Sequence, residues 1–118
     1  MPEFQSLPDA TVVLTTVGNI DQAGALARDL VSRRLAACVT ALPSARSVFV
    51  WKGIVQEEDE VLLLIKTPTE RLPELEQHLR ERHPYDLPEF LALPVAHGSD
   101  PYLAWLRNAT RSGTTEEG

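Results

Sequence analysis

The sequence predicts an α+β domain in which helices cover one face of an antiparallel sheet. Apolar strand-forming segments and amphipathic segments follow one another in the order β-α-β-β-α-β, and a short extra helix comes last. The chain has 118 residues, which is enough for one domain that buries roughly two thirds of its unfolded surface. The apolar content of 43% is that of an ordinary globular protein.

The first half of the chain is expected to supply two strands and one helix. Residues 11–16 are rich in β-branched and apolar side chains, a composition typical of a buried strand. Asp21 is the expected N-cap of a helix that ends near Arg34. Residues 37–51 are expected to form one long strand with an irregularity near Pro43, because proline cannot donate to a strand ladder.

The second half is expected to begin with a turn at Gly53 and a strand at residues 61–66 that is buried on both faces. This strand and the one before it make a long hairpin that projects beyond a small domain. A second helix is expected to begin at Thr69, and the last main strand is expected at residues 89–95. A short C-terminal helix with an aromatic face follows Asp100, whose next residue is a proline.

Right-handed crossovers turn this order of elements into a ferredoxin-like β-α-β-β-α-β sandwich with an extra C-terminal helix. The domain is expected at residues 11–111, between a flexible N-terminal segment at 1–10 and a disordered tail at 112–118. The helices leave one sheet face bare. Because both faces of the long hairpin are apolar, the bare side is expected to pack on another subunit.

Composition argues against several functional classes. A net charge of -6 disfavours nucleic-acid binding, and no apolar run approaches the ~20 residues that span a membrane. Residues 1–10 lack the basic start of a signal peptide, so a cytoplasmic location is expected. The single cysteine excludes an internal disulfide and a CxxC motif. Without a phosphate loop, an HExxH motif or a Ser-His-Asp grouping, an enzyme is not expected.

The segment from His83 to Glu89, with the sequence HPYDLPE, brings an imidazole, a phenol and two carboxylates close together. Its prolines fix their own φ and push the preceding residues out of helical geometry. The segment could present polar groups at the end of the sheet, or it could be only a rigid connection. His83 is the best candidate for a metal ligand, since neutral imidazole binds copper and zinc; the alternative is a C-terminal helix cap.

A series of short motifs resembles the divalent-cation tolerance proteins called CutA. In chain order they are LAACV at 35–39, SVFVWKG at 47–53, Glu60, LIKT at 64–67, HPY at 83–85, Pro88-Glu89 and YLAW at 102–105. The resemblance covers residues 11–108. It implies a tight homotrimer, similar in architecture to the PII signal-transduction proteins, with strands extended across subunits. It also implies a cytoplasmic protein linked to tolerance of copper and other divalent cations, with no established enzymatic activity and no required cofactor.

The copper site described for some members of that family uses a thiolate on the first strand and two adjacent histidines before the proline. This sequence has Thr15 and Thr16 on the first strand, and Arg82 precedes His83. Threonine is a poor ligand for copper, and the arginine charge opposes a metal ion. Only one of the three ligands is retained, so tight copper binding at this place is not expected.

Glu60 stands where the family pattern places an acid, and Lys66 shares its face of the strand by even spacing. The pair could form a buried ion pair across the trimer or two walls of a cleft, near Tyr85 and Trp51. The aromatic rings could instead pack between subunits.

Three further features leave a choice of function open. Cys38 is expected to pack in the apolar core, and Cys38 and Trp105 are both expected to contribute to packing in the trimer. The acidic run at 57–60 could hold calcium or magnesium, or it could be a solvated hairpin end. Two hypotheses follow: a trimeric module that binds Cu(II), another divalent cation or a small ligand, and a PII-like signalling or scaffold trimer that acts by contact without metal.

Overall fold

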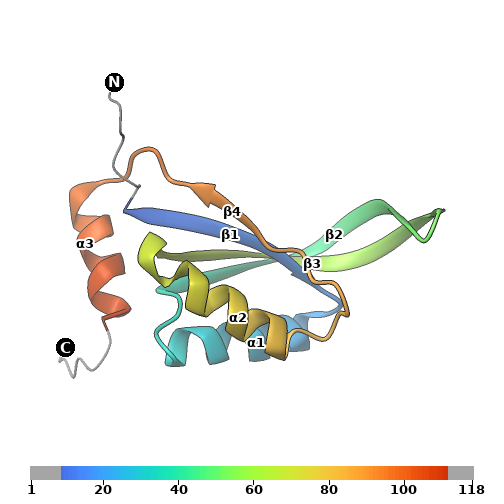
Figure 1. Cartoon of the computed structure of the whole chain (residues 1–118), viewed down its shortest axis with the longest axis horizontal. Coiled ribbons are helices and arrows are strands. Elements are labelled where there is room, and N and C mark those ends of the chain that lie inside the picture. The colour runs from blue at the N-terminus through green and yellow to red at the C-terminus, as the bar shows by residue number, and fades with distance from the viewer. Residues whose placement is uncertain (1–8, 112–118) are drawn as a thin grey trace.

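Residues 9–111 are the part of the chain that the computed structural model describes, and they contain four strands and three α-helices in the predicted order (Figure 1). The elements are β1 (Ala10–Val17), α1 (Ile20–Ser32), β2 (Cys38–Trp51), β3 (Ile54–Pro68), a 3-10 turn η1 (Thr69–Arg71), α2 (Leu72–Arg82), β4 (Leu91–Pro94) and α3 (Asp100–Ala109). Of the flexible segment predicted at 1–10, the structure describes residues 9 and 10, and Ala10 already belongs to β1. The tail predicted at 112–118 lies outside the described residues.

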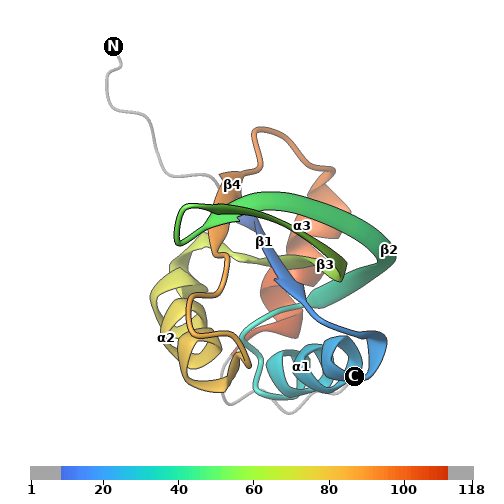
Figure 2. The same ribbon diagram turned by 90° about the vertical axis from the view of Figure 1, so that its right-hand side faces the viewer.

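The four strands form one antiparallel sheet in the order β2-β3-β1-β4. Helices α1 and α2 lie side by side on one face, and α3 stands at the end of the sheet away from the hairpin (Figures 1 and 2). This is the predicted ferredoxin-like α+β sandwich with its C-terminal helix. No helix in residues 9–111 is long and apolar enough to span a membrane.

The main core lies between the sheet and the two helices. Odd-numbered residues of β1 and β3 face the helices, and Val13, Leu63 and Ile65 are fully buried there. Leu30 of α1 and Leu79 of α2 are fully buried against them. Each buried leucine side chain contributes roughly 1.5–3 kcal/mol through the hydrophobic effect, so this layer holds the domain together.

Helix α1 begins slightly earlier than predicted. Asn19, and not Asp21, is the N-cap, because the Asn19 side chain accepts a hydrogen bond of 2.8 Å from the backbone N–H of Gln22. Both residue types cap helices well, and the sequence alone does not decide between two such neighbours. Asp21 instead lies in the first turn, where its carboxylate interacts favourably with the helix dipole.

A carboxylate joins the two helices on their outer side. Asp29 of α1 accepts a hydrogen bond of 2.8 Å from Arg33 and lies 2.6 Å from the ring of His78 on α2. The hydrogen bond from Arg33, followed by that from His78, lowers the pKa of Asp29 below its ordinary value. The contact with His78 links α1 to α2 beyond the apolar contacts beneath it.

The connection into α2 and the last strand differ from expectation at their ends. Thr69 starts a 3-10 turn, and the α-helix itself begins at Leu72, just before Pro73. Strand β4 is shorter than the predicted residues 89–95, although the backbone N–H of Val95 still donates to Ala10. Pairing with β1 is limited to this short edge because Phe90, just before the strand, packs against the helix-covered core.

The sheet face opposite the helices is apolar and has no cover within the described residues. Leu62 and Leu64 of β3 are half-buried there, so the prediction that residues 61–66 are buried on both faces is wrong for a single chain. The register places more leucines and a valine around them, namely Val12, Leu14, Leu42, Leu91 and Leu93. The structure therefore has two apolar sheet faces and only one helical layer.

Strands β2 and β3 continue past the body of the domain as a twisted two-stranded hairpin (Figure 1). The register shifts between Leu42 and Ala45, which confirms the predicted irregularity near Pro43, and Ser44 adopts a φ of 66°. At the tip, Trp51 pairs with Ile54 around a two-residue turn. Its residues Lys52 and Gly53 have φ values of 53° and 80°, as a type I′ hairpin turn requires.

Two buried threonines on the core face make a matched test of this packing. The Thr15 hydroxyl has no hydrogen-bond partner among the described residues, whereas the Thr67 hydroxyl donates to the Leu35 carbonyl at 2.7 Å. Thr15→Val should raise the free energy of unfolding by about 1 kcal/mol, because it removes an unsatisfied buried group. Thr67→Val should lower it by about 1–2 kcal/mol, since Leu35 loses its donor. Urea unfolding measures both; changes of the same sign would contradict the assignment.

Candidate functional site

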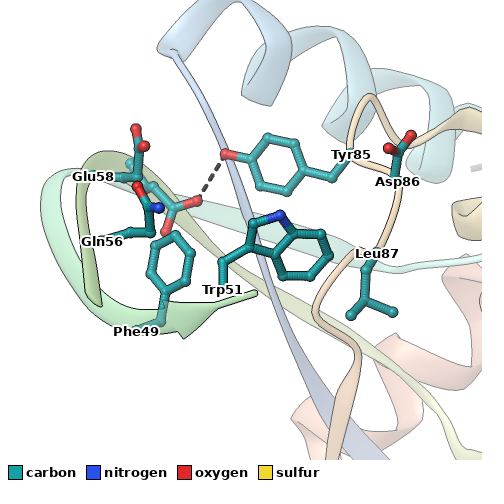
Figure 3. A pocket seen from close by; sticks show the side chains of 8 residues that line it. Phe49, Trp51, Gln56, Glu58, Tyr85, Asp86 and Leu87 are labelled. Carbon is teal, nitrogen blue, oxygen red and sulfur yellow. Dashed lines mark hydrogen bonds between the residues drawn. The ribbon is translucent and has the colours of Figure 1, made fainter. Parts of the chain in front are cut away.

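A pocket of about 420 Å³ lies between the hairpin and the proline-rich connection from α2 to β4 (Figure 3). The hairpin supplies one wall and the connection supplies the other, so residues far apart in the sequence meet here. The lining residues are Phe49, Trp51, Gln56, Glu58, Glu60, Tyr85, Asp86 and Leu87. The structure thus brings together three of the predicted cleft residues: Glu60, Tyr85 and Trp51.

The irregularity in β2 decides which hairpin side chains face this pocket. Before the bulge, Leu42 lies opposite Leu62; after it, Phe49 lies opposite Gln56. One extra residue in β2 changes its phase, so Phe49 and Trp51 share a face with the even-numbered residues of β3. Without the bulge, both aromatic side chains would point to the opposite face of the hairpin.

Glu60 and Tyr85 form the central contact of the site. Strand β1 ends at Val17 opposite Val61, and Tyr85 reaches Glu60 just beyond that end. The Tyr85 hydroxyl donates a hydrogen bond of 2.7 Å to Glu60 Oε2, drawn dashed in Figure 3. Burial, and then the hydrogen bond to Glu60, raise the pKa of Tyr85 well above its usual range. The phenol therefore stays protonated and remains a donor.

His83 holds the connection from α2 to β4 in place, and both of its ring nitrogens form hydrogen bonds. Nδ1 accepts a hydrogen bond of 3.1 Å from the backbone N–H of Tyr85, so Nε2 carries the proton and donates to the Thr16 carbonyl at 2.8 Å. Its backbone N–H also ends α2 by donating to Leu79. The ring is 8% exposed, and this burial lowers its pKa. A metal could bind His83 only after one of these ring hydrogen bonds had broken.

The ligands of the copper site described for related proteins are not assembled around His83. Thr15 faces the helix-covered core, and Arg82 is exposed to solvent. Within residues 9–111, no group of three or more His, Cys, Asp or Glu side chains is arranged to hold a metal ion.

Lys66 shares the face of Glu60 but does not line the pocket. Lys66 comes six residues after Glu60 on β3, which is roughly 20 Å along the strand. The Lys66 ammonium donates to the Thr40 hydroxyl at 3.0 Å and lies 3.7 Å from Cys38 Sγ. Cys38 is half-buried on the uncovered sheet face, so it does not pack in the core of the single chain, and its role in trimer packing stays a prediction.

The acidic run is divided by strand alternation. Glu57 and Asp59 lie on one face, where they form ion pairs of 3.5 and 2.8 Å with Arg46. Glu58 and Glu60 lie on the other face and line the pocket. The run is therefore neither a single cation site nor a wholly solvated end. Trp105 is on α3, away from the pocket, with its ring 5.4 Å from that of Tyr102.

Sequence reasoning missed several lining residues. Phe49, Gln56 and Leu87 were not among the predicted site residues, and Asp86 appeared only within the connecting segment. Alternation along the hairpin would have grouped Phe49 with Gln56 if the irregularity near Pro43 had been taken as one extra residue in β2. Leu87 gives no comparable signal, because only the path of the connection brings it to the pocket.

Similar proteins form one family. A family model described as "CutA1 divalent ion tolerance protein" matches residues 11–109. The Pectobacterium atrosepticum protein called divalent-cation tolerance protein CutA is 47% identical over 105 residues, which cover 89% of this chain and 96% of that protein. The solved structure of the divalent cation tolerance protein from Thermus thermophilus has a TM-score of 0.83 at 45% identity, covering 86% of this chain and 99% of that one.

A plant relative is named for the chloroplast. The Arabidopsis thaliana protein called CutA, chloroplastic, is 44% identical over 112 residues, which are 95% of this chain and 62% of that longer protein. The names of all three relatives concern CutA or cation tolerance, and none names a reaction.

The Glu60–Tyr85 contact gives a first prediction about the site. Tyr85→Phe leaves the buried carboxylate without its donor and should lower the free energy of unfolding by about 1–3 kcal/mol. Tyr102→Phe, at an exposed phenol on α3, should change it by less than about 0.5 kcal/mol. Denaturant unfolding of both variants makes the comparison, and equal losses would show that the hydrogen bond is not the cause.

His83 gives a prediction about pH. Because burial lowers its pKa below the ordinary value of 6.5, the unfolded chain binds the proton more readily than the folded one. The stability due to neutral His83 is therefore complete above pH 6.5 and is lost as pH falls through the lower folded pKa. The free energy of unfolding should be measured between pH 8 and about pH 5. Its dependence on pH should be weaker in His83→Gln than in wild type, and should be unchanged in His97→Gln, a substitution at an exposed position. Parallel profiles for wild type and His83→Gln would contradict this.

Proposed function

We propose, because this chain belongs to the CutA1 divalent ion tolerance protein family, that it functions in the tolerance of divalent cations as a homotrimer. The observation that carries the proposal is the uncovered apolar face of the sheet. The number of three copies comes from the resemblance to CutA and PII proteins. In this proposal the protein is not an enzyme, needs no cofactor and works in the cytoplasm, whereas one relative is named for the chloroplast.

Several large apolar side chains at the sheet edge and on the hairpin are exposed in a single chain. Leu91 and Leu93 at the sheet edge are 56% and 48% exposed. On the hairpin, Ile54 has the same facing as Leu62 and Leu64 and is 63% exposed, while Val50 and Val55 are 66% and 67% exposed on the opposite face. Contiguous apolar patches of this kind mark association sites in soluble proteins. Packing between copies would bury this face of the sheet.

Direct metal binding in this proposal is weak. Copper or another divalent cation would have to displace a hydrogen bond of His83, and Thr15 and Arg82 offer it no further ligand. The family role in cation tolerance therefore does not require a tight copper site in this chain.

A second candidate function is a PII-like signalling or scaffold trimer that acts through protein or small-ligand contacts without metal. The projecting hairpin favours it, because the tip exposes Val48 and Ile54 beyond the body of the domain. Such an extended apolar segment can engage a partner protein while the sheet faces hold the copies together.

The oligomer can be tested with one charge on the uncovered face. Leu64→Glu should convert the assembly to smaller species, because it places a carboxylate at the centre of the apolar surface. Val31→Glu, at an exposed apolar position on the helix layer, should leave the assembly unchanged. Sedimentation equilibrium should give three times the 13.1 kDa chain mass for wild type. A folded monomer at micromolar wild-type concentration would defeat the proposal.

A calorimetric titration of the metal-free protein with Cu(II) separates the two functions. Weak binding that is the same in wild type and His83→Ala is expected, since both His83 nitrogens are occupied. Tight, saturable binding that the variant loses would make His83 a true ligand and would overturn the account of this corner. Complete absence of binding by Cu(II) and other divalent cations would favour the signalling or scaffold function.

A further inference from the structure

The charged side chains that line the pocket are all negative. Three of its lining side chains, Glu58, Glu60 and Asp86, are carboxylates, and among residues 9–111 no lysine or arginine lines it. The ion pairs seen within residues 9–111 join other carboxylates to their cations. The neighbouring His83 has a lowered pKa and is neutral at pH 7, and the Tyr85 phenol, whose pKa is raised, is neutral as well.

Glu60 is the strongest sign that something is bound here. Its side chain is buried, with 8% exposure, and the hydrogen bond that it accepts within residues 9–111 comes from the neutral phenol of Tyr85. A buried carboxylate is costly unless a cation or several donors compensate its charge. The position of Glu60 on the pocket wall means that a cation in the pocket would supply what the chain itself does not.

The other walls are aromatic. The side chains of Phe49, Trp51 and Tyr85 surround the space, with the indole between the phenyl ring of the hairpin and the phenol of the connection (Figure 3). Ring faces attract cations by cation–π interaction. The Trp51 ring already does so in this chain, because the Lys52 ammonium lies 5.9 Å from its centroid at the hairpin tip.

This combination suits an organic cation better than a bare metal ion. Calcium takes about 6–8 oxygen ligands and magnesium about six, and the aromatic walls cannot provide them. An alkylammonium group, by contrast, uses both the carboxylates and the ring faces. The volume of about 420 Å³ is also much larger than an ion and lies within the roughly 300–1,000 Å³ of small-molecule sites.

We propose that this pocket binds a small organic cation, whose alkylammonium group lies against Trp51 and Phe49 and is neutralised by Glu58, Glu60 and Asp86. The inference does not rest on the proposed divalent-cation role. It also differs from the second candidate function, because the ligand is a small molecule in the pocket and not a protein on the hairpin.

Choline is the probe, and its uncharged isostere 3,3-dimethyl-1-butanol is the control of equal shape. Calorimetric titration of the whole assembled protein at constant ionic strength should show saturable binding of choline and none of the isostere. Equal binding of both compounds would show an apolar cavity without cation recognition and would overturn the proposal. No binding of choline would overturn it too, including the case in which a side chain of a second copy fills the pocket.

Matched variants locate the site. Glu58→Gln, at an exposed carboxylate, and Trp51→Leu should each weaken choline binding roughly 3- to 30-fold. Glu57→Gln, on the other face of the same strand, and Trp105→Leu on α3 should leave it unchanged. Equal effects of Glu57→Gln and Glu58→Gln would mean that only the general charge of the hairpin matters, which contradicts the proposal.

Two further measurements do not depend on the folding of the Trp51 variant. Lys52→Gln removes the chain's own cation from the indole and should tighten choline binding, whereas weaker binding would contradict the assigned ring contact. Magnesium chloride should displace choline no better than sodium chloride of the same ionic strength. Stronger displacement by magnesium would make the pocket a metal site and would overturn the choice of ligand.

Discussion

Within residues 9–111, helices α1 and α2 bury one face of the sheet and leave the other face, which is also apolar, without cover. The described part of the chain has no further helix for that side, since α3 stands at the end of the sheet (Figure 1). Burial of apolar surface is the main favourable term in folding and in association, and we therefore propose that copies of the chain cover this face. The proposed trimer, the half-buried position of Cys38 and the exposure of the hairpin all follow from this one imbalance.

The bulge near Pro43 connects that architecture to the pocket. Up to the bulge, β2 helps to extend the apolar sheet face; beyond it, the changed phase turns Phe49 and Trp51 toward the carboxylates of β3. In the two proposals made above, the same strand therefore serves association in one part and ligand recognition in another. The His83 corner completes the arrangement, because its two ring hydrogen bonds hold the backbone that carries Tyr85 to Glu60.

The order of elements, the long hairpin and its irregularity could be predicted from the sequence, because apolar periodicity and prolines act locally. The cap of α1 could not, since Asn19 and Asp21 are equally good caps two residues apart. The sequence also could not predict which face of the hairpin Phe49 and Trp51 lie on. Valines alternate with them, so both faces of the hairpin are apolar. The role of His83 also depended on distant partners: only the fold shows that Thr16 and Tyr85 occupy its nitrogens.

The concentration dependence of unfolding tests most directly the claim that copies of the chain cover the bare sheet face. If association buries that face, the midpoint of thermal unfolding must rise with protein concentration across a range of about a hundredfold. The account predicts such a rise, together with a smaller one for Leu64→Glu. A midpoint that stays constant across that range, with the mass of a single chain, would contradict it.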